Sequence, residues 1–297
     1  EASTITIDSK KKDFRIKKNN TWAKYNTLFS LYKTAQTPFS WYPKIFNFCK
    51  KNKIIVFASV FDEKSLSILE KLKCPAYKIA SPEITDIPLI STVSKTKKPI
   101  IISNGLASES DLKLAINTVR KQKNPNLVVL KCTSSYPAPI NEINLLTMKD
   151  INKKYKTLVG YSDHTNGYQI SINAASLGAC LIEKHVGLKN MKSVDSFFSL
   201  NTEEFKEMVK IIRDNEIANG NVNYNISKSS IKNLNGRRSL YVVKDIKKGE
   251  KFTKKNIRSI RPTFGMHPKF LSQFLNKVCN KSLKKGSRLL WKHLKKS

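Results

Sequence analysis

The chain has no paired cysteines, few acidic residues and no long apolar run, and each shortage excludes a class of protein. No stretch of the 297 residues approaches the roughly 18 to 20 consecutive apolar residues that cross a bilayer, and the polar first residues contain no signal-peptide core. The five cysteines are odd in number and far apart, with no Cys-x-x-Cys spacing for zinc or redox chemistry. We therefore expect a cytoplasmic protein with reduced thiols and no membrane partner.

Acidic residues are scarce: 22 Asp and Glu face 55 Lys and Arg, which gives a formal net charge of +33. Such a charge often indicates a nucleic-acid partner. Here the lysines are scattered through every segment together with many Asn and Ile, instead of forming one patch. We therefore expect no nucleic-acid partner, although a basic nucleic-acid-binding protein remains the alternative of a different class. The positive field would attract anionic metabolites.

Short apolar or β-branched runs recur along the chain, separated by amphipathic segments of helix length. The runs lie at residues 54–58, 76–80, 99–103, 127–132, 158–161 and 180–183. Segments 63–73 and 108–122 show the i, i+3, i+4 apolar spacing of helices that cover a sheet, and Ser108 with Asp111 three residues later predicts a capped helix start. Six successive strand and helix units indicate a parallel α/β fold.

Polar residues follow every one of these runs. They are Ser59; Lys78, Ser81 and Glu83; Ser103 and Asn104; residues 133–136; residues 162–164; and His185. A doubly wound sheet concentrates its ligand contacts near one switch point, whereas a barrel collects them from a ring of loops around one mouth. The pattern favours a barrel, although six units are two fewer than the eight that close one.

Two histidines stand at the ends of neighbouring runs, His164 in TLVGYSDHT and His185 in CLIEKH. In a strand, helix, strand arrangement both lie at the same edge of a parallel sheet, with Asp163 and Glu183 beside them. Two imidazoles there could form an incomplete metal site with positions open for substrate, or could be ordinary hydrogen-bonded histidines.

The last third of the chain changes character. A helix is predicted at about 202–219, with acidic residues in its first turn and Gly220 at its end. Residues 221–236 are polar and predict a linker. Beyond them, strand-like runs broken at Lys248-Gly249 predict a compact β-rich module of about 60 residues. A module of this size is too small to bury a large core, so we expect it to pack against another surface.

Ordered motifs across the chain resemble the sialic acid synthase family. They are YKIASPEITDIPLI (77–90), KPIIISNGLA (98–107), KCTSSYPAP (131–139), VGYSDHT (159–165), LGACLIEKH (177–185), RRSLYVVKDIKKGE (237–250) and IRPTFGMHP (260–268). The resemblance implies an α/β TIM (β/α)8 barrel, followed by a small β-rich antifreeze-like SAF domain of the β-clip type. The family opens with two further βα elements that this sequence does not contain. We therefore expect a partial barrel over residues 1–220, a linker over 221–236 and the SAF domain over 237–297.

The resemblance also implies a reaction. Family members condense phosphoenolpyruvate with an N-acetylated amino sugar to give a nonulosonic acid and phosphate. A divalent cation, Mn²⁺ or Mg²⁺, would be bound by His164 and His185 and would polarise the aldehyde oxygen of the open-chain sugar. The segments TPFSW (37–41), FSL (198–200) and RPTFGMHP (261–268) are most similar to the pseudaminic acid branch of the family. The alternatives are the neuraminic and legionaminic acid branches and an inactive truncated fragment.

Further site residues are carried over from the family motifs. Lys78 is expected to meet the anionic groups of phosphoenolpyruvate, Glu83 to act as a general base and Asp195 to lie near the sugar. Substrate contacts are expected from Ser81, Ser103, Ser134, Tyr136 and Ser162. Arg261 of the SAF domain is expected to contact the acyl amide of the sugar in the partner subunit, which implies a domain-swapped homodimer. The family's Ser-Thr-Gly-Met motif is Ser-Asn-Gly-Leu here, at residues 103–106.

Overall fold

The computed structural model describes residues 2–295. Its contacts divide the chain into two compact units, the first ending at Gly220 and the second beginning at Asn221. Each unit contains a hydrophobic core of its own. Within the described residues, none of the helices has both the length and the apolar character that a membrane span requires.

The first unit is built on a parallel sheet of six strands in sequential order. The strands are β1 (Ala58–Ser59), β2 (Tyr77–Ile79), β3 (Ile100–Ser103), β4 (Leu127–Cys132), β5 (Leu158–Asp163) and β6 (Ile182–Lys184). Each strand pairs in parallel with the next, so all six carboxyl ends lie along one edge. The sheet forms a half-barrel, as expected for a barrel fold with six of its eight strands.

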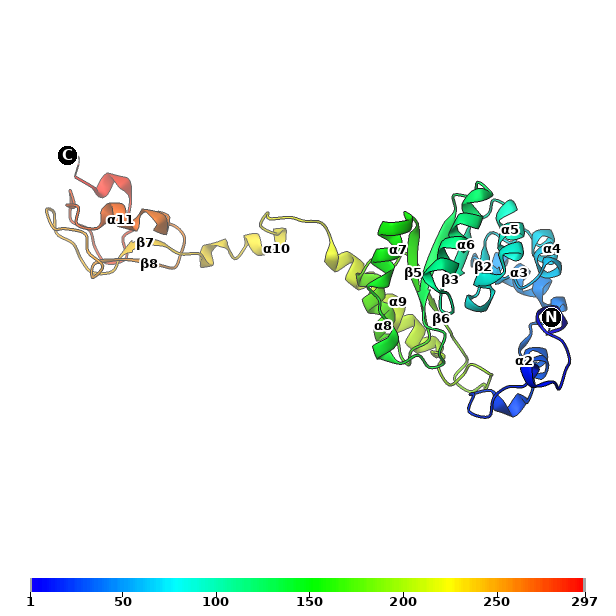
Figure 1. Ribbon diagram of the computed structural model, residues 1–297. Helices are drawn as coiled ribbons and strands as arrows, with labels where there is room; N and C mark the ends of the chain where they lie inside the picture. Colours follow the sequence, from blue (N-terminus) through cyan, green and yellow to red (C-terminus); the bar gives the residue numbers. More distant parts are fainter. Residues whose placement is uncertain (1, 296–297) are drawn as a thin grey trace. The chain divides into compact units, whose positions relative to one another are not determined.

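Helices follow the strands and cover the outer side of the sheet (Figure 1). They are α4 (Glu63–Lys71), α5 (Ile87–Lys95), α6 (Glu109–Lys121), α7 (Thr147–Tyr155), α8 (Gln169–Ser176) and α9 (Thr202–Asn219). The predicted start at Ser108 is confirmed, since Ser108 and Asp111 form a capping box at α6. Helix α9 ends at Gly220, whose φ is +47°.

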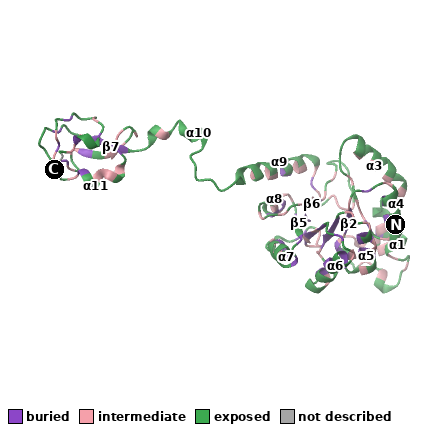
Figure 2. Ribbon diagram, turned by 90° about the horizontal axis from the view of Figure 1, so that it is seen from above, coloured by how far each residue is buried: buried purple, intermediate pink, exposed green. Residues whose placement is uncertain are grey.

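Along each strand, side chains point alternately outward into the core and inward toward the mouth of the half-barrel. In β2, Tyr77 and Ile79 point outward into the core beneath the helices, while Lys78 between them points inward. Figure 2 shows the resulting concentration of buried residues on the strands, with solvent-exposed outer faces on the helices. The inward positions nearest the carboxyl ends are polar, and these positions form the site.

The segment before β1 contains α1 (Ala2–Ile5), α2 (Leu28–Ala35) and α3 (Tyr42–Lys51). The strand predicted at residues 54–58 is wrong over most of its length, since only Ala58 and Ser59 pair. Among the described residues β1 has a single neighbouring strand, and Ile55 is 80 % exposed. An apolar run becomes a strand only where partner groups satisfy its backbone and a second layer covers its side chains.

The second unit pairs β7 (Ser239–Val242) with β8 (Ile257–Ile260) in antiparallel register. Two short helices, α10 (Lys228–Ile231) and α11 (Leu271–Phe274), belong to the same unit. The expected β-rich module has a core of its own around Phe252 and Phe274. Gly249, in the predicted turn, has a φ of +89°, a conformation that favours glycine.

Candidate active site

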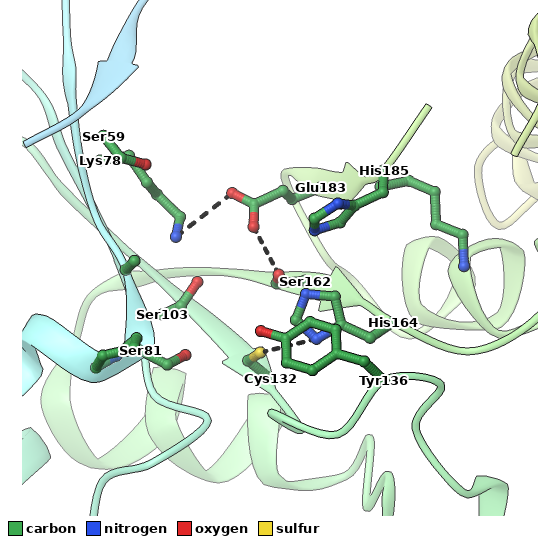
Figure 3. A pocket seen from close by; sticks show the side chains of 13 residues that line it. Ser59, Lys78, Ser81, Ser103, Cys132, Tyr136, Ser162, His164, Glu183 and His185 are labelled. Carbon is green, nitrogen blue, oxygen red and sulfur yellow. Dashed lines mark hydrogen bonds and ion pairs between the residues drawn. The ribbon is translucent and has the colours of Figure 1, made fainter. Parts of the chain in front are cut away.

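A cavity of about 400 Å³ opens at the carboxyl ends of the six strands. Figure 3 shows side chains from every strand end converging on it. Its polar lining comprises Ser59, Lys78, Ser81, Ser103, Cys132, Tyr136, Ser162, His164, Glu183, Lys184 and His185. Eight of the eleven predicted site residues lie in or beside this cavity: Lys78, Ser81, Ser103, Ser134, Tyr136, Ser162, His164 and His185.

One side of the cavity is suited to an anion. Lys78 is only 6 % exposed, and its Nζ lies 3.5 Å from a carboxylate oxygen of Glu183. The Oγ of Ser103 is buried and, within the described residues, has no hydrogen-bond partner. A buried hydroxyl without a partner costs free energy unless a ligand supplies one. A lysine ammonium and an unsatisfied hydroxyl therefore face the same space.

The backbone at Gly105 holds the serines of this side in place. The Gly105 N–H donates to Ser81 Oγ at 3.0 Å. A Cβ atom at Gly105 would collide with the Oγ atoms of Ser134 and Ser81 and with the Cys132 sulfur. Three side chains thus pack so closely against this backbone position that a residue larger than glycine would displace them.

Glu183 joins the anion side to the histidine side. One of its oxygens accepts a hydrogen bond from Ser162 Oγ at 2.6 Å, and the other lies near Lys78 Nζ. Figure 3 shows both interactions crossing the cavity. The sequence placed Glu183 beside the histidines but assigned it no role. Its period-two spacing from His185 on an inward face is the signal that could have identified it.

The two histidines meet as predicted, with ring centroids 5.2 Å apart in an edge arrangement. His164 Nδ1 lies 3.0 Å from the Thr133 carbonyl oxygen, so Nδ1–H donates to it and Nε2 keeps its lone pair. His185 Nδ1 lies 3.4 Å from Asp195 Oδ2. Imidazoles oriented by a carbonyl and a carboxylate are a common arrangement of metal ligands.

This donor set fits a divalent cation with two imidazole ligands and further positions open to substrate. Within residues 2–295, no group of three or more His, Cys, Asp or Glu side chains is placed to bind a metal. Burial acts to lower the pKa of His164, but contact with Cys132 and the Thr133 carbonyl raises it overall. Burial acts to raise the pKa of Cys132, whereas contact with His164, Ser81 and Ser162 lowers it overall.

Aromatic rings enclose the histidines. The Tyr136 ring lies 4.4 Å from His164, 5.1 Å from Phe198 and 5.4 Å from Trp22, measured between centroids. Burial, with the negative charges nearby, raises the pKa of Tyr136 to about 12. Tyr136 is therefore a neutral hydroxyl at any ordinary pH, and it can donate a hydrogen bond into the cavity.

The other three predicted site residues are Glu83, Asp195 and Arg261. Glu83 follows Ser81 and Pro82, with its Oε2 buried and, among the described residues, unpaired. Burial raises the pKa of Glu83 to about 7, with Lys78 opposing the shift. Asp195 reaches the site through His185, and Arg261 belongs to the second unit.

A buried ion pair lies directly behind the histidines. The side chains of Asp163 and Lys184 are both fully buried, and Lys184 Nζ lies 3.2 Å from Asp163 Oδ2. Asp163 also accepts hydrogen bonds from the Thr165 N–H and from Ser171 Oγ, and Lys184 Nζ donates to the Thr165 carbonyl at 2.5 Å. The sequence places Asp163 beside the histidines, but no local pattern pairs it with Lys184.

Comparisons with known proteins give the following matches. Residues 1–224 match the NeuB family, and residues 237–295 match the SAF domain. The chain is 41% identical over 287 residues to a pseudaminic acid synthase of Campylobacter jejuni, covering 96% of this chain and 83% of that protein. It is 40% identical over 289 residues to a pseudaminic acid synthase of Helicobacter pylori, covering 97% and 84%. Among solved structures, a spore coat polysaccharide biosynthesis protein of Bacillus subtilis superposes with a TM-score of 0.60 at 27% identity, covering 96% of this chain and 84% of that one.

Proposed function

The chain belongs to the NeuB family of sialic acid synthases, and we propose that it condenses phosphoenolpyruvate with 2,4-diacetamido-2,4,6-trideoxy-L-altrose to give pseudaminic acid and phosphate. Identity of about 40% to pseudaminic acid synthases over nearly the whole chain supports this assignment. The observation that carries it is the meeting, at one sheet edge, of an anion-binding side and an imidazole pair. The reaction requires this combination, since it joins an anionic phosphoenolpyruvate to an aldehyde.

Phosphoenolpyruvate would occupy the side of the cavity formed by Lys78, Ser81, Ser103 and Ser162. Lys78 supplies a nearly desolvated positive charge, and the serine hydroxyls donate hydrogen bonds to phosphate or carboxylate oxygens. The unpaired Oγ of Ser103 supports this placement, because an anionic oxygen would satisfy it. Glu183 positions the ammonium group of Lys78 through their ion pair, and Ser162 in turn donates a hydrogen bond to Glu183.

His164 and His185 would hold a divalent cation, Mn²⁺ or Mg²⁺, which supplies Lewis-acid polarisation of a carbonyl oxygen. The Thr133 carbonyl fixes the tautomer of His164, and Asp195 orients His185. Tyr136, a neutral hydroxyl beside His164, would position the sugar. In this arrangement the aldehyde carbon would lie beside the phosphoenolpyruvate side of the cavity.

The carbon–carbon bond forms between the methylene carbon of phosphoenolpyruvate and the aldehyde carbon. This leaves a cationic centre at C2 and a negative charge on the former aldehyde oxygen, which takes up a proton and becomes a hydroxyl. Water adds at C2 and gives up a proton, and the bond from C2 to the phosphate oxygen then breaks, which releases phosphate and leaves a ketone at C2. Glu83, with a pKa near 7, is suited to take the proton of that water at its carboxylate. Asp195 would lie near the sugar.

The second unit matches the SAF domain, and we propose that its Arg261 contacts the acyl amide of the sugar in a homodimer. The family resemblance of the motif at residues 260–268 supports this proposal.

The assignment is tested by phosphate release from phosphoenolpyruvate with Mn²⁺, comparing the diacetamido trideoxy sugar with N-acetylmannosamine. Release with the diacetamido sugar alone is expected. Release with N-acetylmannosamine alone would move the protein to the neuraminic acid branch, and no release with either would contradict the proposal. His164→Ala is expected to abolish both phosphate release and Mn²⁺ binding. The thermal unfolding midpoint without metal is the control for its fold.

A further inference from the structure

A second cavity, of about 360 Å³, adjoins the candidate active site. It is enclosed by the segment before α2, by α2 itself and by the loop after β6. Figure 1 shows the N-terminal segment approaching that loop, and the Trp22 indole N–H donates to the Val194 carbonyl at 3.3 Å. Its lining is Ile16, Asn20, Trp22, Leu28, Leu31, Tyr32, Ala35, Val194 and Asp195.

Two contacts connect this second cavity to the histidines. Trp22, in its wall, packs against Tyr136, and Tyr136 packs against His164. Asp195, also in its wall, lies 3.4 Å from His185. Single side chains, Tyr136 on one path and Asp195 on the other, thus lie between this cavity and the two histidines that would hold the aldehyde end of the sugar.

Five of the nine lining side chains are aliphatic or alanine, and the two most polar ones are Asn20 and Asp195. Asn20 Oδ1 accepts a hydrogen bond from the backbone N–H of Trp22 at 2.9 Å, which leaves its Nδ2 as a donor for a ligand. Asp195 contributes a carboxylate, one oxygen of which faces His185. The lining therefore offers one amide donor, one acceptor and an apolar wall.

An acetamido group presents the matching features: a carbonyl oxygen, an N–H and a methyl group. We propose that this second cavity binds the acetamido group of the sugar that is remote from the aldehyde carbon. Asn20 Nδ2 donates to its carbonyl, Asp195 accepts its N–H, and Leu28, Leu31 and Ala35 contact its methyl. The inference rests on the proposed function and makes the cavity the element that selects a diacetamido sugar.

The selectivity has a physical reason. A sugar with a hydroxyl at that carbon leaves the apolar wall empty and leaves Asn20 and Asp195 without well-placed partners. Sites built to hydrogen-bond a substrate group discriminate strongly against analogues that lack it. N-acetylmannosamine, with one acetamido group, is such an analogue.

Two substitutions test the proposal. Asn20→Asp keeps the oxygen that accepts the Trp22 backbone N–H and replaces the amide donor by a carboxylate oxygen. It is expected to lower kcat/KM for the diacetamido sugar about 10- to 100-fold, while the KM for phosphoenolpyruvate stays unchanged. Ala35→Phe places a ring in the cavity and is expected to have the same effect. Lys33→Phe, on the same helix but outside this lining, is the matched control and should behave as wild type.

Binding of the diacetamido alditol, which has no aldehyde and cannot react, provides a second readout by calorimetry. Weaker alditol binding by both Asn20→Asp and Ala35→Phe, with Lys33→Phe unaffected, would support the subsite. Unchanged binding and unchanged kcat/KM in both variants would overturn it. Equal losses for the diacetamido sugar and for any slow turnover of N-acetylmannosamine would also overturn it. If wild-type protein does not turn over the diacetamido sugar but binds its alditol through Asn20, the proposed reaction fails and the subsite stands.

Discussion

At the scale of single residues, Glu83 illustrates how burial sets chemistry. Burial opposes ionisation of its carboxyl and raises the pKa to about 7, with one oxygen unpaired among the described residues. A base with a pKa near the working pH combines a populated carboxylate with useful proton affinity. The buried carboxyl of Glu83 also lowers the free energy of unfolding when it is ionised. Between pH 4.5 and 7 the folded state binds more protons than the unfolded state, so stability falls as pH rises through that window.

We expect the pH profile of kcat to rise through about pH 7, because the general base must be deprotonated to act. Glu83→Gln should remove this limb and lower kcat about 100-fold or more. The variant should also be more stable than wild type above pH 7, by about 2 kcal/mol after allowance for partial solvent screening. Steady-state rates and urea unfolding between pH 5.5 and 8.5 measure both effects.

Glu109→Gln is the control, since Glu109 is an exposed carboxylate that pairs with Lys154 on the outer side of the sheet. It should leave the pH profile of kcat unchanged. Persistence of the same limb in Glu83→Gln would assign the ionisation to another group.

At the scale of elements, the ends of β5 and β6 are joined by the pair of Asp163 and Lys184. Each residue directly precedes one of the two histidines, and their side chains are fully buried. Burial lowers the pKa of Lys184, and attraction to Asp163 opposes that shift. Because the pair cross-links the two strand ends, we infer that it sets the spacing of the imidazoles.

Lys184→Met should therefore destabilise the fold by about 3–5 kcal/mol, since it leaves Asp163 as an uncompensated buried charge. The double variant Asp163→Asn with Lys184→Met should lose less than the two single variants added together. If the pair positions the histidines, Mn²⁺ affinity of the double variant should fall about 10- to 100-fold. Urea unfolding and Mn²⁺ titration measure these effects.

Lys98→Met provides the comparison. Lys98 pairs with Glu70 at 2.6 Å, but both side chains are partly exposed. Its loss should cost less than about 1 kcal/mol and leave Mn²⁺ affinity unchanged. Wild-type Mn²⁺ affinity in the double variant would show that the pair contributes to stability alone.

At the scale of the whole molecule, the net charge influences which ligands the protein attracts. The formal charge of +33 creates a field that favours anionic ligands, and phosphoenolpyruvate is one of the two proposed substrates. The sugar is neutral. The same field therefore acts on one substrate and leaves the other unaffected.

We expect kcat/KM for phosphoenolpyruvate to fall about 3- to 10-fold as ionic strength rises from about 20 to 300 mM, because the screening length shortens to below 10 Å. The KM for the neutral sugar should stay constant over the same range. Initial rates in NaCl, with sucrose of equal osmolality as the control, measure the effect. An equal response of both substrates would indicate a general salt effect on the fold.

Local sequence patterns were sufficient for much of the fold and half of the site. Helix α6 begins at its predicted cap, and β4 matches its predicted bounds, because hydrogen bonds and side-chain periodicity within one element decide both. Ser103, Ser162, His164 and His185 were predicted because each ends or follows an apolar run, whereas Lys78 was carried over from the family motif. The parallel order of the strands then places them at one edge.

Other features depend on register and on contacts between distant segments, so only the tertiary structure decided them. Glu183 reaches Ser162 across 21 residues, and it does so only because β5 and β6 pair with those two residues opposite each other. Trp22 reaches Val194 across 172 residues. The strand predicted at residues 54–58 shortened because pairing and covering layers decide whether an apolar run becomes a strand. The sequence by itself determined which residue types stand at the strand ends. The tertiary structure decided which of them touch, because contact depends on strand register and on the curvature of the sheet.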